Sequence, residues 1–340
     1  MCARGTGRAL GQWGVAVLVS GGLLAYLFVT REIDPRAIGP LIGAVSLPGV
    51  LAFLGVSLAA LVLRTLRYWL LLGRRASLWP LTLVTLVRNL FVDLVPARAG
   101  AAASYLYLVT ARLGLPVEAA IASFILSFVL DTLALAPLLL LAVLVVGGAP
   151  LPPAVLVGGS LLILFGSIIA LLGLAPGLGM AARLAARLPG PLRRAGPALA
   201  RAAAEVRRLE FRRVLAPALG LSLLLRVAKY GAYYCLLQAL LVSQGHGWWS
   251  LDFIRVFLSV TGAELAASLP LPTIASLGPY EAAGALGFEH WLGLDRGLAA
   301  LAATAFHVLS QVHDYGLGLL ALLWIMAPWA GRPRACKLNS

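Results

Sequence analysis

The chain has 340 residues, of which 61% are apolar and only 12% are charged. Apolar runs longer than about 18 residues recur along it, which indicates membrane-spanning helices and excludes a water-soluble globular protein. The net charge of +14 falls in short segments between these runs, and no set of aromatic residues for base stacking is interleaved with the arginines of residues 183–213. Positive-inside orientation and anionic lipids explain this pattern better than nucleic-acid binding does.

Six apolar runs are long enough to cross a bilayer. They lie at about residues 10–30, 48–72, 116–148, 153–175, 214–242 and 297–328. The first follows Arg4 and Arg8 like a signal sequence, but no small-residue cleavage site comes after it, so we expect a retained span. The three cysteines, Cys2, Cys235 and Cys336, have neither metal nor redox spacing.

Basic residues between the runs predict the orientation. The connection 176–213 is the most basic, because its part 183–213 holds nine arginines against Glu205 and Glu210. We therefore expect this basic loop in the cytoplasm. Arg4 and Arg8 place the N-terminus there too, and the basic tail after residue 328 places the C-terminus on the same side. The chain is thus predicted to be a multi-pass protein of the plasma membrane.

Two segments then have both flanks on one side of the membrane and must enter and return. Residues 76–112 have cytoplasmic flanks and contain the stretch NLFVDLVPARAGAAASYLYL at 89–108. Residues 250–296 have external flanks and contain ELAASLPLPTIASLGPYEAAG at 264–284. Proline and glycine break both stretches. Non-helical backbone at this depth is tolerated only where protein covers it or a water-filled cavity adjoins it, so two breaks predict an interior cavity.

Short motifs repeat in the same order in the two halves of the chain. LRTLRY at 63–68 corresponds to LRVAKY at 225–230, and LDTLAL at 130–135 corresponds to HDYGLG at 313–318. The predicted fold is therefore all-α: a polytopic helical bundle of about six full spans plus two re-entrant helix pairs in an inverted repeat. We expect one domain over residues 1–340, with repeat 1 at about 48–148 and repeat 2 at about 214–328.

Charged side chains inside the spans are the candidate functional residues, since a charge in the bilayer is costly unless it is paired or wetted. The cations are Arg64, Arg67, Arg88, Arg98, Arg226 and Lys229, and the acids are Asp93, Asp131, Glu264, Glu281 and Asp314. Internal ion pairs, such as Asp131 with Arg64 or Asp314 with Arg226, are the alternative interpretation.

Arginines beside a broken helix suit an anion, because guanidinium binds phosphate oxygens bidentately and helix N-termini add amide donors. A phospholipid head group or a polyprenyl phosphate is such an anion. His307, His313 and Glu264 are candidates for a proton relay, with a histidine bonded inside the bundle as the alternative.

Enzyme signatures are missing from the sequence. It contains no Gly-Lys-Ser/Thr phosphate loop, no His-Glu-x-x-His and no Gly-x-Ser-x-Gly. We expect no enzyme activity and therefore no catalytic residue, cofactor or metal. An intramembrane head-group transferase and a non-transporting partner in cell-envelope assembly remain the alternatives.

Four stretches together resemble a known family. They are LRTLRYWLLL, NLFVDLVPARAG…SYLYL, RLGLPVEAAIASFILSFVLDTLAL and ASLGPYEAAGALG…LGL, in this order. The chain is similar, over about residues 10–328, to the lysylphosphatidylglycerol synthase transmembrane (flippase-like) family. The resemblance implies a membrane domain that moves an anionic or head-group-modified lipid between leaflets. Full-length synthases add a soluble aminoacyl-transferase domain, which this chain lacks, so lysyl transfer is not expected.

The family pattern matches Pro96, Arg98 and Gly100 at the first break, Asp131 in the following span, and Gly278 with Glu281 at the second break. One departure concerns the acid that usually follows Arg-x-Gly, since Ala101-Ala102-Ala103 stands there instead. This change either frees Arg98 for a substrate phosphate or leaves the site degenerate.

The leading hypothesis is transbilayer movement of an anionic or head-group-modified phospholipid, or of a lipid-linked intermediate, without an ATPase. Membrane lipids are the expected partners, and nucleic acid is not. Both a homo-oligomer and a cell-envelope enzyme partner remain open. The predicted contact residues are Arg98, Arg64, Arg67, Asn89, Asp93, Asp131, Arg226, Lys229, Tyr280, Glu281 and Asp314, with His313, His307 and Glu264 as the relay.

Overall fold

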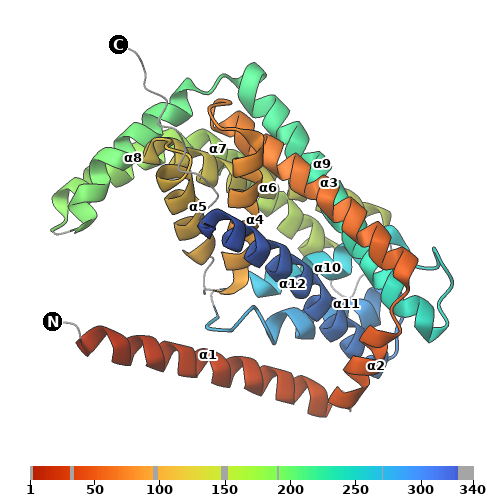
Figure 1. Ribbon diagram of the computed structural model, residues 1–340. Helices are drawn as coiled ribbons and strands as arrows, with labels where there is room; N and C mark the ends of the chain where they lie inside the picture. Colours follow the sequence, from red (N-terminus) through yellow and green to blue (C-terminus); the bar gives the residue numbers. More distant parts are fainter. Residues whose placement is uncertain are drawn as a thin grey trace.

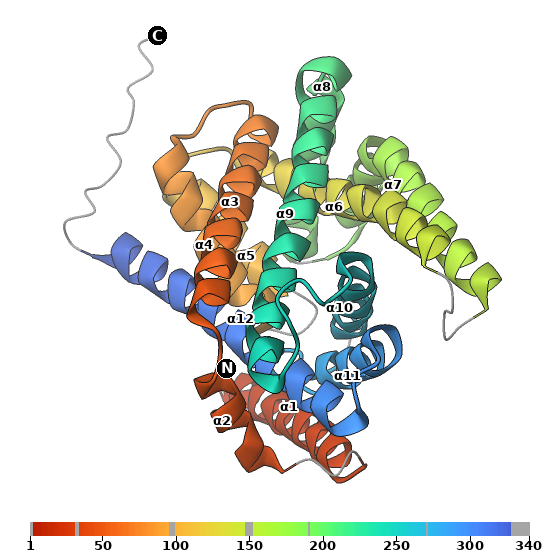
Figure 2. The same ribbon diagram turned by 90° about the vertical axis from the view of Figure 1, so that its right-hand side faces the viewer.

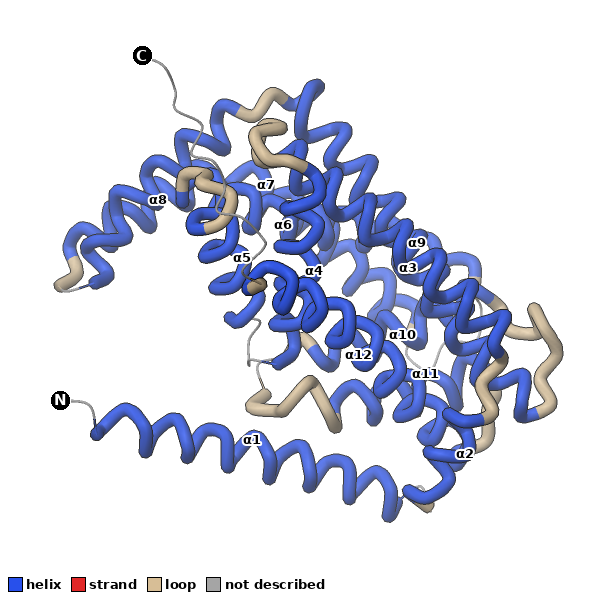
Figure 3. The backbone as a smooth tube through the Cα atoms, viewed as in Figure 1, coloured by secondary structure: helices blue, strands red, loops and turns tan. Residues whose placement is uncertain are grey.

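A computed structural model describes residues 3–30, 34–94, 99–146, 152–189, 191–269 and 271–327. This part of the chain is helical and contains no strand, which confirms the predicted all-α membrane fold (Figures 1 and 3). The helices are α1 (Ala3–Thr30), α2 (Ile38–Gly43), α3 (Leu47–Leu71), α4 (Leu78–Leu94), α5 (Ala99–Ala111), α6 (Val117–Val145), α7 (Pro153–Arg187), α8 (Pro191–Arg208), α9 (Ala216–Leu241), α10 (Phe253–Ala267), α11 (Pro279–Leu292) and α12 (Arg296–Met326).

Among the described residues, five helices are long and apolar enough to span a bilayer. They are α3, α6, α7, α9 with its flanking turns, and α12, and they agree with five of the six predicted spans. Helix α1 contributes the shorter apolar stretch Val17–Thr30, so the sixth span stays a prediction. Large apolar side chains such as Leu162 and Leu172 are about three-quarters exposed (74% and 75%), as expected of a surface that faces lipid.

Each predicted re-entrant segment forms two short helices around a break. Helices α4 and α5 have 17 and 13 residues, and α10 and α11 have 15 and 14. At about 1.5 Å per residue these helices are about 20–25 Å long, short of the ~30 Å hydrocarbon core. Their lengths therefore fit helices that enter the membrane and turn back.

The long helices that open the two halves, α3 and α9, pack side by side and antiparallel (Figures 1 and 2). The amide N–H of Ser46 donates to the carbonyl of Ala239 at one end, and Leu71 packs with Ala218 at the other. Both halves thus run long helix, two short helices, long helix, about an antiparallel seam. The inverted repeat stays a prediction, and this element order supports it.

Small residues set the closest helix crossings, as is usual in membrane bundles. A Cβ atom placed on Gly49 would lie 2.6 Å from Ala239 between α3 and α9. A Cβ on Gly318 of α12 would lie 2.5 Å from the Cβ atom of Leu90 on α4. The last helix of one half therefore lies directly against the re-entrant pair of the other half.

The basic connection 176–213 is helical rather than an open loop. Helix α7 continues to Arg187, and α8 folds back along it with Ala202 and Ala203 buried against Leu178. The arginines of α8 are exposed, whereas its apolar residues recur at helical spacing on the buried side. Sequence reasoning missed this helix because it took the stretch as a basic connection only, although nine apolar residues accompany the five arginines of α8 and recur at helical spacing.

Candidate functional site

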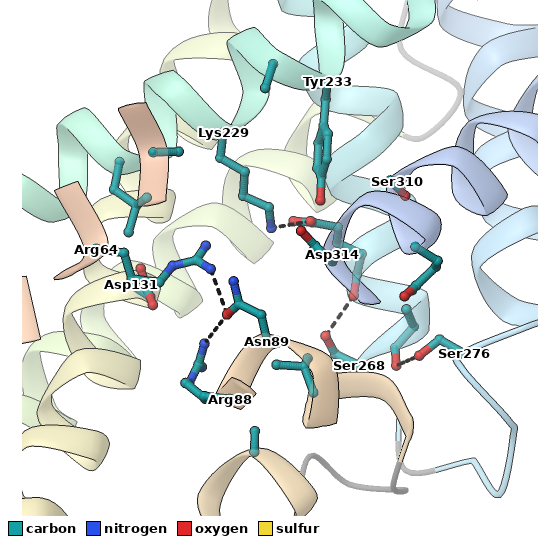
Figure 4. A pocket seen from close by; sticks show the side chains of 18 of the residues that line it. Arg64, Arg88, Asn89, Asp131, Lys229, Tyr233, Ser268, Ser276, Ser310 and Asp314 are labelled. Carbon is teal, nitrogen blue, oxygen red and sulfur yellow. Dashed lines mark hydrogen bonds and ion pairs between the residues drawn. The ribbon is translucent and has the colours of Figure 1, made fainter. Parts of the chain in front are cut away.

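The predicted interior cavity exists. It has a volume of about 690 Å³ and is lined by residues from α3, α4, α5, α6, α9, α10, α11 and α12, that is, from both halves. Ten predicted site residues line it: Arg64, Asn89, Asp131, Arg226, Lys229, Glu264, Tyr280, His307, His313 and Asp314. Figure 4 shows labelled side chains from several of these helices pointing into the same space.

Two guanidinium groups share one neutral acceptor on a wall of this cavity. Arg64 on α3 and Arg88 on α4 donate to the same side-chain oxygen, Oδ1 of Asn89, over 2.9 and 3.2 Å (Figure 4). No carboxylate of the described side chains forms an ion pair with either arginine. This guanidinium pair therefore holds two positive charges around a single uncharged oxygen.

Asp131 on α6 is engaged by two other cations. It accepts hydrogen bonds from both Nη atoms of Arg67, over 2.6 and 3.0 Å. Arg67 is 1% exposed and also donates to the hydroxyl of Ser222 on α9. Arg226 lies 3.8 Å from the carboxylate and donates to the backbone carbonyl of Asp131. The predicted ion-pair alternative thus holds for Asp131, but its partner is Arg67 and not Arg64.

A second ion pair crosses the cavity between α9 and α10. Lys229 donates to one oxygen of Glu264, and the hydroxyl of Tyr230 donates to the other over 3.0 Å. In LRTLRY and in LRVAKY the second cation pairs with a carboxylate, but the acids come from different positions of the two halves: Asp131 is on α6 and Glu264 on α10.

Glu281 and His307 form a buried pair behind the second break. Glu281 is fully buried; one carboxylate oxygen accepts the N–H of Gly278 over 2.6 Å, and the other lies 2.6 Å from Nδ1 of His307. The ring of Tyr280 stacks on His307 at 4.0 Å. Glu281 therefore caps α11 and ties the break to α12.

Asp314 faces the cavity beside His313. Its carboxylate lies 3.1 Å from Nδ1 of His313 and is 46% exposed, and Figure 4 shows it across the space from Arg64. Among the ion pairs of the described residues, none joins Asp314 to an arginine or lysine, so the predicted pair with Arg226 is not formed. His313 packs edge-on against Phe53.

Two predicted contact residues lie elsewhere, and two more are not described by the structure. Arg67 and Glu281 do not line the cavity. Both side chains are buried, and they bond Asp131 and His307, which favours a structural role. Arg98 lies outside the described residues, as does the side chain of Asp93. Their roles stay predictions. Ala101, where the family usually carries an acid, is buried and lines the cavity.

Sequence reasoning undervalued several residues of the site. Arg88 is one of the predicted intramembrane cations, but nothing in its sequence neighbourhood marks it as half of a guanidinium pair. Tyr233, Ser310 and Gln311 also line the cavity. The signal for Arg88 is its position directly before Asn89, which becomes informative only once α3 and α4 are known to pack together.

Comparison with known proteins decides the family. The profile of the family described as Lysylphosphatidylglycerol synthase TM region matches residues 13–318, which is most of the chain. The chain belongs to this family. It is therefore a multi-pass membrane protein of a family connected with phospholipids, as the resemblance in sequence implies. No curated protein and no solved structure matches it.

Proposed function

We propose that the chain moves an anionic lipid head group across the bilayer through the central cavity. The observation that carries this proposal is the guanidinium pair, Arg64 and Arg88, converging on Asn89 Oδ1. Among the described side chains no carboxylate forms an ion pair with these two cations, and in a low-dielectric interior such an arrangement favours an anion. A phosphate offers several oxygens to the same N–H donors and adds the missing negative charge.

The cavity also suits the movement of a lipid head group without a chemical reaction on it. It lies between two halves that meet along α3 and α9, and lining residues come from both breaks: Ala99 and Ala101 near the first, Thr273 and Ser276 from the second. Transport in this proposal needs no enzyme activity, and it takes place in the plasma membrane with both termini cytoplasmic.

The test is lipid movement between leaflets in proteoliposomes, followed with fluorescent phospholipids that have anionic or neutral head groups. Asn89→Asp is the sharpest variant, because it places a carboxylate between Arg64 and Arg88 and neutralises the pair without removing either cation. We expect anionic-lipid movement to fall about tenfold or more, which corresponds to at least ~1.4 kcal/mol, while folding is unchanged or improved.

Arg88→Gln should lower anionic-lipid movement to the same extent. Arg75→Gln is the matched control, since Arg75 is an exposed arginine paired with Glu205 far from the cavity lining. Anionic-lipid movement at the wild-type rate in both Asn89→Asp and Arg88→Gln would refute the proposal. Mass spectrometry of lipids from cells with and without the chain separates the enzyme alternative, because a new or missing lipid species would indicate chemistry.

A further inference from the structure

Helix α1 holds the second break through direct contacts with its backbone. The hydroxyl of Ser20, a side chain 5% exposed, accepts the N–H of Ile274 over 2.9 Å. Leu23 lies against Gly278 so closely that a Cβ atom on the glycine would fall 2.6 Å from the leucine Cβ atom. Figures 1 and 2 show α1 at the edge of the bundle, next to α11.

The segment that α1 holds is a wall of the cavity. Leu271, Thr273 and Ser276 line it. The backbone there is strained, because Ala275 and Ser276 have left-handed φ angles of 52° and 59° although neither is glycine. Such conformations persist only where the surroundings enforce them. Two neighbours do so here, the Glu281 cap from inside the bundle and α1 from outside.

The described part of α1 touches the bundle along one stripe, on which Ser20 and Leu27 are each 5% exposed, and two glycines adjoin Ser20. On its described surface, Leu18, Tyr26 and Val29 are 75%, 69% and 78% exposed. Gly21 and Gly22 directly follow Ser20, and nothing lies within 4 Å of a Cβ atom placed on either. No close packing therefore requires these glycines, and paired glycines weaken a helix.

We propose that α1 is a latch on the second break, and that a lipid head group reaches the cavity through this wall when α1 moves aside. Ser20 and Leu23 are its positioning residues. This inference rests on the proposed lipid transport. When α1 leaves, the N–H of Ile274 loses its acceptor, and an unpaired amide is costly inside a membrane. A phosphate oxygen of the arriving lipid replaces the Ser20 hydroxyl, so the substrate itself favours opening.

The test locks α1 with a reversible disulfide. Because Ser20 Oγ lies 2.9 Å from the Ile274 nitrogen, bond lengths keep the two Cα atoms within about 7 Å, which is the reach of a disulfide. Ser20→Cys and Ile274→Cys are combined with alanine at the three native cysteines. A third substitution, Ser310→Cys, places a thiol in the cavity, and the probe is a phospholipid whose head group carries a maleimide.

We expect modification at position 310 to be at least tenfold slower in the oxidised protein than after reduction. Leu320→Cys in place of Ser310→Cys is the control, since Leu320 is 64% exposed on the same helix and should react equally in both states. Equal rates at position 310 with the disulfide formed would overturn the latch. If the lock controls modification but no lipid moves between leaflets, the latch stands and the proposed transport fails.

In this proposal α1 bends at Gly21 and Gly22, and a second variant tests this hinge without a cross-link. Gly21→Ala with Gly22→Ala stiffens α1 and meets no atom, so the fold should remain intact. Modification at position 310, in the chain without the lock, should then slow about threefold or more. Replacement of Gly14 by alanine, which also meets nothing within 4 Å, is the matched control. An unchanged rate in the double variant would contradict a hinge at this point.

Discussion

Arg64 and Arg67 lie three residues apart on α3 and have different roles. Arg67 is buried in a bidentate pair with Asp131, whereas Arg64 faces the cavity and bonds only a neutral amide oxygen among the described residues. Sequence spacing predicted both as contact residues on one helical face. The difference arises because α6 and α9 surround Arg67, while α4 brings Arg88 and Asn89 to Arg64.

For this ion pair we predict that Asp131→Asn destabilises the protein strongly. The substitution leaves the buried charge of Arg67 without its counter-ion, which typically costs about 3–5 kcal/mol. The measurement is denaturant-induced unfolding in mixed micelles. Glu205→Gln, which breaks the exposed pair with Arg75, is the control and should cost below ~1 kcal/mol. If Asp131→Asn lowers the free energy of unfolding no more than the control does, the pair of Arg67 and Asp131 does not stabilise the bundle.

The short helices are positioned by close helix crossings. Helix propensity along the sequence does not predict these crossings. Helix α4 carries Arg88 and Asn89, and its place is set where Leu86 and Leu90 lie over Gly318 of α12. The α10–α11 pair is closed in a similar way, since a Cβ atom on Gly287 would lie 2.9 Å from the Cα atom of Ser259. The close approach of backbones at glycine brings charged side chains of different helices within hydrogen-bonding distance.

We therefore predict that Gly318→Ala separates α4 from α12. Its Cβ atom would fall 2.5 Å from that of Leu90 and 2.9 Å from the carbonyl oxygen of Leu86, so backbone must shift. Overpacking of this kind costs about 1–3 kcal/mol, and lipid movement should fall as the guanidinium pair is displaced. Gly316→Ala on the same helix has nothing within 4 Å and should be neutral or stabilising. Equal effects of the two substitutions in unfolding measurements would contradict this crossing.

At the scale of the whole molecule, the two halves meet antiparallel along α3 and α9, and the cavity forms between them. This arrangement places the start of α5 and the segment that contains Thr273 and Ser276 beside the same space. The topology that the charge distribution predicts has the two re-entrant pairs opening to opposite sides of the membrane.

Single cysteines test that topology in intact cells. Ser77→Cys and Ala111→Cys flank the first pair, and Ser250→Cys and Arg296→Cys flank the second; all four positions are exposed. A membrane-impermeant thiol reagent added outside should label positions 250 and 296, while positions 77 and 111 should react only after lysis. If only one of positions 77 and 111 is labelled in intact cells, residues 76–112 cross the membrane and the re-entrant interpretation is wrong.

The sequence by itself determined the fold class, five of the long helices, both breaks and the existence of a charged interior. These features follow from short stretches of the sequence: the length of apolar runs, the placement of proline and glycine, and the presence of charged residues inside apolar runs. Only the tertiary structure decided which charges pair and which face the cavity, because that depends on which helices pack together. It also decided that α1 contacts the second break, since Ser20 and Ile274 are 254 residues apart and no local pattern joins them.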